Sequence, residues 1–364
     1  MSSSRSLSRH LAIAYIFLLV YACLHPLGGW QSKGLPVFGY LFAPWPKYFI
    51  FSDFILNILG FVPLGLTLTP SLPRSWSWRG RVVAVTLFGL LLSFSVETLQ
   101  VFLPARAASN TDISANVLGT LLGALLGARW GQALFAPGHG LARWREQYIT
   151  DGRTGDAGLI LILLWLLVQL MPSYLLFAGG GVRALLGITP PLPFEAGRLI
   201  AFETAQTASM MVAVGLFARC TLRLRGRTLV AALLVLGIGA RTAASAFFFT
   251  PSSPWVWLSA GTEYGVVLGG ALLFVILRLS RVAQHALAGM GLLMACVLIN
   301  MMPESPYLQG GGPGFISNGN YANFHGLCRL VAAGWPFAAL AYLSAVGLWR
   351  GERLEDGSGA GRPP

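Results

Sequence analysis

Charged residues are scarce in this sequence. Of its 364 residues only 10% are charged, and just 13 are acidic. By contrast, 55% are hydrophobic and the mean hydropathy is +0.66, far above the composition of an ordinary soluble domain. The composition therefore excludes a typical soluble globular protein and indicates a membrane protein.

Motifs of the common catalytic and metal chemistries are also missing. The four cysteines, Cys23, Cys220, Cys296 and Cys328, form no CxxC pair and no metal-ligand spacing. The sequence contains no recognisable nucleotide-binding loop and no Ser–His pair. We therefore expect no disulfide framework, no metal site and no cofactor, and the chain carries no recognised catalytic motif.

Long apolar stretches dominate the chain instead. Each is long enough to cross about 30 Å of hydrocarbon. They lie near 10–28, 49–69, 82–103, 113–134, 157–178, 199–218, 228–249, 255–277, 282–302 and 328–349. The first is longer than a signal-peptide core, and "CLHPLGGWQSKG" after it offers no cleavage-like site. The prediction is an all-α polytopic integral membrane protein with about ten transmembrane helices.

The net charge of +12 raises the question of a nucleic-acid partner. If the N-terminus is cytoplasmic, 18 of the 25 basic residues fall in cytoplasmic segments. The other seven are Lys33, Lys47, Arg106, Arg183, Arg198, Arg241 and Arg329. This is the positive-inside bias of membrane proteins, so we expect both termini in the cytoplasm and no nucleic-acid partner.

The spans divide into two groups. The longest predicted cytoplasmic loop, 135–156, is polar and charged, and we expect it to link two membrane domains. The first is a four-helix domain over 1–134, and the second has about six helices over 157–349. Residues 350–364, "RGERLEDGSGAGRPP", have the composition of a disordered cytoplasmic tail.

Polar side chains gather at the outer ends of the second, third and fourth spans. They recur at i,i+3 or i,i+4 spacing, so each pair shares one helix face. The pairs are Asp53 with Asn57, Glu97 with Gln100, and Asp112 with Asn116, and Arg106 lies in the loop between the third and fourth spans. Because the three helices place these groups at a similar depth, the sequence predicts one polar layer.

This layer has two interpretations. In the structural one, Asp53 and either Asp112 or Thr111 are helix N-caps, the three amides form interhelical hydrogen bonds, and Arg106 lies among lipid headgroups. In the functional one, the layer binds a ligand, and Arg106 pairs with one of the carboxylates. Glu97 favours a functional site, because an ionisable group inside a span costs at least a few kcal/mol unless it is paired or hydrated.

Small residues continue below the layer. Gly119, Gly123 and Gly127 form a GxxxGxxxG series, which allows another helix to approach closely. Pro63 predicts a bend in the second span.

These residues also carry a family resemblance. "DFILNILGFVPLG", "SVETLQVFLPAR" and "TDISANVLGTLLGALLG" resemble the VanZ-like family, a bacterial membrane domain named after a protein that raises teicoplanin resistance. The resemblance covers roughly residues 10–134. It departs from the family in "AASNT", where a second acidic residue often precedes the aspartate and where Asn110 stands instead. It implies a ligand site at Asp53, Asn57, Glu97, Gln100, Arg106, Asp112 and Asn116, without supplying a reaction.

The six later spans lie outside that resemblance. Their charged groups are Glu203, Arg241, Glu263 and Arg329, and Asn300 lies at the same predicted side of the membrane. Arg241 is the expected partner of the two glutamates. Either a buried ion-pair network or a cavity shared with the first domain would explain these groups.

Three classes of function follow. The first is an envelope protein of the bacterial cytoplasmic membrane that binds a membrane lipid, a lipid-linked envelope component or an amphiphilic drug at the outer leaflet. The second is an enzyme on a lipid-linked precursor, in which carboxylates act as general acid and base and Arg106 holds a phosphate. The third is a transporter, although the charges gather at one face and no inverted repeat is evident. The sequence leaves the oligomeric state open.

Overall fold

The structure of the protein is a computed structural model. It describes residues 3–25, 27–34, 36–44, 51–135, 139–150, 152–171, 174–222, 227–248, 254–255, 257–303 and 319–359. These residues form helices and no β-strand, apart from an isolated bridge between Ile149 and Leu222. The chain divides into two compact units, 1–147 with 317–327 and 148–316 with 328–364, and the division falls inside the predicted linker.

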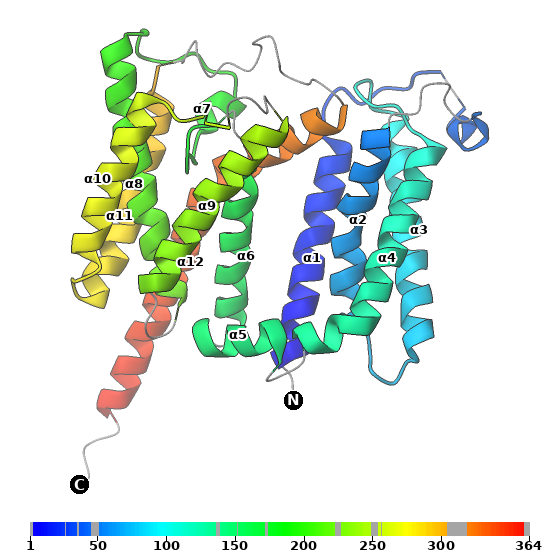
Figure 1. The fold of residues 1–364 in the computed structure, drawn as a ribbon, viewed down its shortest axis with the longest axis horizontal. Coiled ribbons are helices and arrows are strands. Elements are labelled where there is room, and N and C mark those ends of the chain that lie inside the picture. The colour runs from blue at the N-terminus through cyan, green and yellow to red at the C-terminus, as the bar shows by residue number, and fades with distance from the viewer. Residues whose placement is uncertain are drawn as a thin grey trace. The chain divides into compact units, whose positions relative to one another are not determined.

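Unit 1 contains four long helices and two short ones (Figure 1). The long helices are α1 (Ser3–Leu24), α2 (Phe51–Ser71), α3 (Trp78–Gln100) and α4 (Asn110–Phe135). A 3₁₀ helix, η1 (Gly39–Phe42), precedes α2, and α5 (Gly140–Tyr148) follows α4. In Figure 1, α5 runs crosswise to the long helices, and its Trp144 is exposed, as is typical of tryptophan at a membrane interface. This segment was predicted to be a linker loop, and the helix was not predicted.

Unit 2 contains the remaining helices. They are α6 (Gly152–Gln169), α7 (Val182–Leu185), α8 (Ala196–Thr221), α9 (Arg227–Phe248), α10 (Ala260–Ile276), α11 (Arg281–Met301) and α12 (Gly319–Gly359), whose first residues belong to unit 1. The helix α12 continues into the predicted disordered tail, where Arg350, Glu352 and Arg353 are good helix formers. Residues 360–364 lie outside the described part of the chain.

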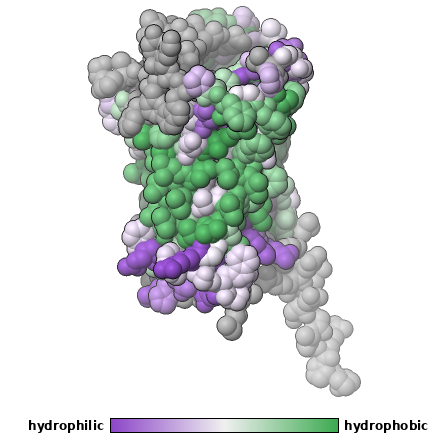
Figure 2. All heavy atoms as spheres, turned by 90° about the vertical axis from the view of Figure 1, so that its right-hand side faces the viewer, coloured by the Kyte–Doolittle hydropathy of each residue, from purple (hydrophilic) through white to green (hydrophobic). Residues whose placement is uncertain are grey.

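The prediction of about ten transmembrane helices is confirmed. Among the described residues, nine helices are long and apolar enough to span a membrane. The tenth predicted span corresponds to α10, an apolar helix of 17 residues. Exposed apolar side chains face outward, as on α3, where Val83, Leu87 and Leu91 are 57%, 53% and 63% exposed. On the face in Figure 2, hydrophobic residues form a belt with a hydrophilic band at one end, as expected for a protein surrounded by lipid.

Glycine brings α2 and α4 into close contact. A Cβ atom added to Gly119 would overlap the carbonyl oxygen of Ile58, and one added to Gly123 would overlap that of Val62. One added to Gly127 would lie 3.0 Å from the carbonyl oxygen of Leu66. The GxxxGxxxG prediction is therefore confirmed, and α2 is the partner helix.

Unit 2 buries a segment of irregular backbone between α6 and α7. Residues 175–180 are buried, although irregular backbone inside a membrane domain needs hydrogen-bond partners. The Gly180 N–H donates to the carbonyl oxygen of Ala332 at 2.9 Å. That oxygen has no helical partner, because Pro336, four residues on in α12, has no N–H. The irregular segment therefore gains an acceptor for its Gly180 N–H, and the Ala332 carbonyl gains the donor that Pro336 cannot supply.

Candidate functional site

The polar layer of unit 1 begins with Glu97 and Gln100 at the end of α3. Both are buried, with 2% and 7% of their surface exposed. Oε2 of Glu97 accepts a hydrogen bond from the Ser109 N–H at 2.9 Å. The Gln100 Nε2 donates to the carbonyl oxygen of Cys23 at 2.9 Å. Glu97 therefore holds the end of the α3–α4 loop, and Gln100 holds the last turn of α1.

Arg106 binds the end of α1, and it pairs with no carboxylate in the part of the chain that the structure describes. Its Nε donates to the His25 carbonyl at 2.8 Å, and its NH2 group donates to the Ala22 carbonyl at 2.8 Å. A cation is favourable at a helix C-terminus, where carbonyl groups lack partners. Burial lowers the pKa of the guanidinium below its usual value, and nearby Cys23 and Glu97 act in the opposite direction.

The expected ion pair of Arg106 is therefore absent. No contact within 4.0 Å joins it to Asp53, Glu97 or Asp112 in the described residues. The sequence analysis considered carboxylates and lipid headgroups as partners and did not consider the α1 carbonyls. A guanidinium has five donors in a planar fork, which suits several backbone acceptors at once.

Asp53, Asn57 and Asp112 are half-buried. The Asn57 amide lies within hydrogen-bonding reach of the Asp112 carboxyl group, and Asp53 is close enough to interact with Asp112 electrostatically. Glu97 interacts electrostatically with Asp112 as well. Asp112 on α4 is therefore near enough to interact with Asp53 on α2 and with Glu97 on α3.

Asn116 lies one turn below Asp112 and is 3% exposed. Its Nδ2 donates to the Ser93 hydroxyl at 2.9 Å and so links α4 to α3. Its Oδ1 is buried and has no hydrogen-bond partner among the described residues. The prediction of an interhelical amide hydrogen bond is confirmed at this position, with one acceptor left over.

The N-terminal cap of α4 differs from the prediction. The helix begins at Asn110, and the Ser109 hydroxyl accepts from the Thr111 N–H at 3.2 Å and contacts the Thr111 hydroxyl at 2.6 Å. Neither Asp112 nor Thr111 is the cap, because both already lie inside the helix. The carboxyl group of Asp112 is therefore not needed for capping and is left for another role.

A pocket of about 350 Å³ lies beside this layer. Its lining residues are Lys33, Pro36, Gly39, Tyr40, Ala43, Val101, Arg106, Ala107 and Ala108. The Lys33 Nζ donates to the Arg106 carbonyl at 2.6 Å, and the Tyr40 hydroxyl contacts the Thr98 hydroxyl at 3.0 Å. The wall is therefore largely apolar, with two cationic side chains.

The segment 27–44 was missed as a part of the site. Asn110, the first residue of α4, donates from Nδ2 to the Ala43 carbonyl at 2.8 Å. The loop before α2 is thus tied to α3 by Tyr40, to the α3–α4 loop by Lys33 and to the start of α4 by Asn110. In the sequence, the one sign that this loop belongs to the site was the basic Lys33 near aromatic residues.

The charged groups of unit 2 do not pair as predicted. The Arg241 guanidinium donates to the Tyr174 carbonyl and, at 3.2 Å, to Oε1 of Gln169. Glu203 accepts from the Ser259 hydroxyl at 2.6 Å, while Glu263 is exposed. Arg241 forms no ion pair with either glutamate in the described part of the chain. The prediction of a buried ion-pair network around Arg241 is therefore wrong there.

Two further predicted polar residues of unit 2 bind backbone groups. The Asn300 Nδ2 donates to the carbonyls of Gly180 and Cys296 at 2.7 Å each, and its Oδ1 accepts from the Arg183 N–H at 2.8 Å. Arg329 donates to the Ala184 carbonyl. Both therefore hold the irregular segment and α7 in place, while a cavity shared between the units stays a prediction.

In the part of the chain that the structure describes, nine long apolar helices with outward-facing apolar side chains define a multi-pass α-helical membrane protein. Residues 12–131 of this protein match the family model described as VanZ/LLP1. The N-terminal part of the chain, from α1 into α4, is thus similar to this family, and the later helices lie outside the match. Neither a search of curated proteins nor a search of solved structures found a match to the chain.

Proposed function

We propose that the VanZ-like unit binds a lipid-linked or amphiphilic ligand at the outer leaflet of a bacterial cytoplasmic membrane. The binding would serve a cell-envelope process such as resistance to teicoplanin-type glycopeptides. The observation that carries the proposal is the pocket of about 350 Å³, whose lining residue Arg106 interacts electrostatically with Glu97 and Asp112. An apolar wall with a few polar groups is typical of small-molecule sites.

The pocket and the carboxyl groups share one short stretch of chain. Glu97 is bonded to Ser109, next to Ala108 in the pocket wall. Thr98 follows Glu97 and contacts the wall residue Tyr40. An apolar group in the pocket would therefore bring a polar headgroup to Lys33 on one side and to the carboxyl groups on the other.

Filling the pocket tests this proposal. Ala108→Phe adds a ring to the lining, so we expect the variant to lose the envelope phenotype while it still folds. The measurement is teicoplanin susceptibility of a host that depends on the protein, together with the abundance of the protein in its membranes.

Ala105→Phe is the matched control. Ala105 is exposed on the same loop and is not among the residues that line the pocket, so this variant should behave as the wild type. Equal resistance from both variants at equal abundance would argue against a ligand in the pocket.

An enzyme on a lipid-linked precursor is the second candidate. The carboxyl groups of Glu97 and Asp112 are near enough to interact, and a pair of carboxyl groups that shares a proton can supply a general acid and a general base. Turnover of a purified lipid-linked precursor by the wild type, lost in Asp112→Asn, would favour the enzyme over a simple binder.

A further inference from the structure

We propose that unit 2 contains a sodium-ion site between α8 and α10, with the Glu203 carboxylate as its charged ligand. The other oxygen donors are the side chains of Gln206, Thr207, Ser259 and Thr262. The site lies outside the VanZ-like match and does not depend on the function proposed for unit 1.

Glu203 is a buried carboxylate without a cationic partner. It is 3% exposed, and its contact is the Ser259 hydroxyl, which donates to Oε2 at 2.6 Å. No lysine or arginine forms an ion pair with it within the described ranges. A lone charge at this depth is expensive, so a bound cation would stabilise it.

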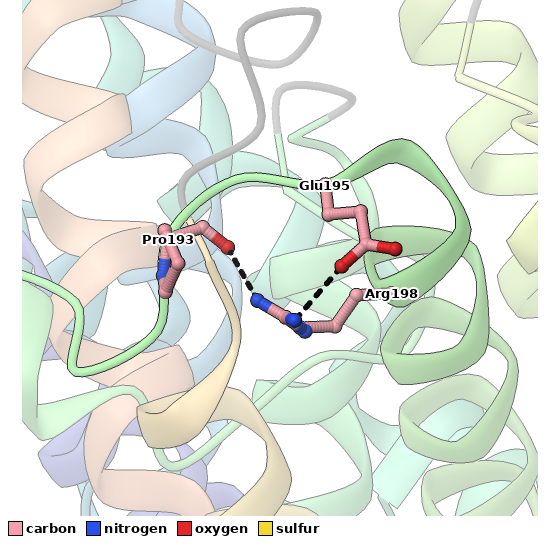
Figure 3. A network of polar contacts seen from close by, with 3 residues as sticks. All are labelled: Pro193, Glu195 and Arg198. Carbon is pink, nitrogen blue, oxygen red and sulfur yellow. Dashed lines mark hydrogen bonds and ion pairs between the residues drawn. The ribbon is translucent and has the colours of Figure 1, made fainter.

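The nearest arginine along the helix is already engaged. Arg198, five positions before Glu203, contacts Oε2 of Glu195 at 2.8 Å and donates to the Pro193 carbonyl at 3.1 Å. Figure 3 shows its guanidinium directed at these two residues at the start of α8. It therefore pairs with Glu195 and is not the counter-charge of Glu203.

One turn further along α8, two side chains have unused hydrogen-bonding atoms. Gln206 and Thr207 follow Glu203 at i+3 and i+4, so the three side chains lie on one face of the helix. Both are 0% exposed. Among the described residues, neither Nε2 nor Oε1 of Gln206 has a hydrogen-bond partner, and neither has the Thr207 hydroxyl. Buried polar groups are nearly always satisfied, so the two unpartnered oxygens, Oε1 of Gln206 and the Thr207 hydroxyl, point to a missing ligand.

α10 supplies two more oxygens at close range. The Ser259 hydroxyl caps α10 by accepting from the Thr262 N–H at 3.1 Å, and it lies 2.9 Å from the Thr262 hydroxyl. A Cβ atom on Gly261 would lie 2.7 Å from Oε2 of Glu203, and one on Gly265 would lie 2.6 Å from Cβ of Thr207. The glycines therefore allow α10 to approach the polar face of α8.

The donor set favours a small monovalent ion. Every proposed ligand atom is an oxygen, which is the preference of hard cations. One carboxylate balances one positive charge, whereas calcium and magnesium usually bind more than one. The tight contact between the two helices favours sodium over the larger potassium ion.

Direct binding of radioactive sodium to the purified full-length protein tests the site. We expect the wild type to retain about one ion per chain (from the single carboxylate ligand), and excess potassium to displace it poorly. Glu203→Gln keeps the size of the side chain and removes its charge, so the affinity should fall at least tenfold. Glu263→Gln is the matched control, because Glu263 is an exposed glutamate on α10 and its loss should change nothing.

A second variant, Thr207→Val, tests the site even if Glu203→Gln does not fold. Thr207→Val keeps the shape of the side chain and removes one oxygen, so it should fold and bind sodium several-fold more weakly. Absence of sodium binding by the wild type would overturn the proposal and leave Glu203 as a neutral acid bonded to Ser259. Unchanged affinity in the folded Thr207→Val or Glu203→Gln variant would overturn it as well.

Discussion

Arginine in this protein satisfies backbone carbonyl groups at places where helices end. Arg106 binds the carbonyls of Ala22 and His25 after α1. Arg241 binds the Tyr174 carbonyl in the segment after α6. Unpaired carbonyl groups are costly in a bilayer, and the guanidinium offers several donors at a point where the helix dipole favours a cation. Neither arginine needs a carboxylate for its position to be explained.

Arg106→Ala should therefore destabilise unit 1. It removes two charge-assisted hydrogen bonds, each worth about 1.5–3 kcal/mol, so the free energy of unfolding should fall by about 3 kcal/mol. Arg106→Lys should recover only part of this loss, because an ammonium group lacks the planar fork. Thermal unfolding of the purified protein is the measurement.

Arg129→Ala is the control for Arg106. Its guanidinium is exposed and lies 6.0 Å from the Trp130 ring, so its loss should have little effect on unfolding. Normal stability of Arg106→Ala would show that the α1 carbonyls find other partners. Arg106 would then be free to act as a ligand-binding residue.

The contact between α2 and α4 is the element that brings the polar residues together. Asp53 and Asn57 lie on α2, Asp112 and Asn116 lie on α4, and the two backbones touch along the glycine series below them. Because the backbones leave no room for a Cβ atom at Gly119 and Gly123, a larger side chain there would push the helices apart and change the distances between the carboxyl groups. The geometry of the site therefore depends on glycines that do not belong to it.

Gly123→Ala and Gly60→Ala make the same chemical change with opposite expected results. A Cβ atom on Gly123 would overlap the Val62 carbonyl, whereas one on Gly60 meets nothing within 4 Å. Gly123→Ala should lower the free energy of unfolding by about 1–3 kcal/mol through overpacking. Gly60→Ala should be neutral or stabilising by up to ~1 kcal/mol, since alanine favours a helix.

Thermal unfolding and the yield of folded protein distinguish the two glycine variants. Gly123→Leu should prevent folding, while Leu122→Ile should be nearly silent because Leu122 is 41% exposed. Equal behaviour of the Gly123 and Gly60 variants would mean that α4 does not pack closely on α2.

The whole molecule combines a unit that contains the match to the VanZ/LLP1 family model with a second helical unit. The distribution of arginine predicts that the α3–α4 loop faces the outside and that α5 faces the cytoplasm. In a variant without the four native cysteines, an impermeant thiol reagent should therefore label Ala108→Cys from outside intact cells. Gln147→Cys, which is exposed at the other end of the unit, should react only after the membrane is opened. Labelling of Gln147→Cys in intact cells would contradict the ten-span topology.

Much of this fold could be predicted from the sequence. The ten helices follow from apolar length alone, and the closeness of α2 and α4 follows from glycine spacing. The helix α5 was missed because its nine residues, several of them charged or polar, are too few and too polar to carry a span signal. The partners of Arg106 and Arg241 were missed because spacing along a helix shows which residues share a face, and it does not show which carbonyl group a long side chain reaches across the fold.

The site itself was predictable only in part. Equal depth on three helices was enough to bring Asp53, Glu97 and Asp112 together. The pocket depends on the loop around Lys33 and Tyr40, whose path has no periodic pattern. Ser109, the cap of α4 and the donor to Glu97, lies among several residues that are equally suited to capping.

The central claim is that the polar layer of unit 1 holds a ligand through its carboxyl groups. Native mass spectrometry of the protein purified with its membrane lipids, compared with Glu97→Gln, tests it most directly. The wild type should carry one co-purified species of defined mass, and the folded Glu97→Gln variant should lose that species. If both carry only the same mixture of bulk phospholipids, the layer is a structural network and the claim is wrong.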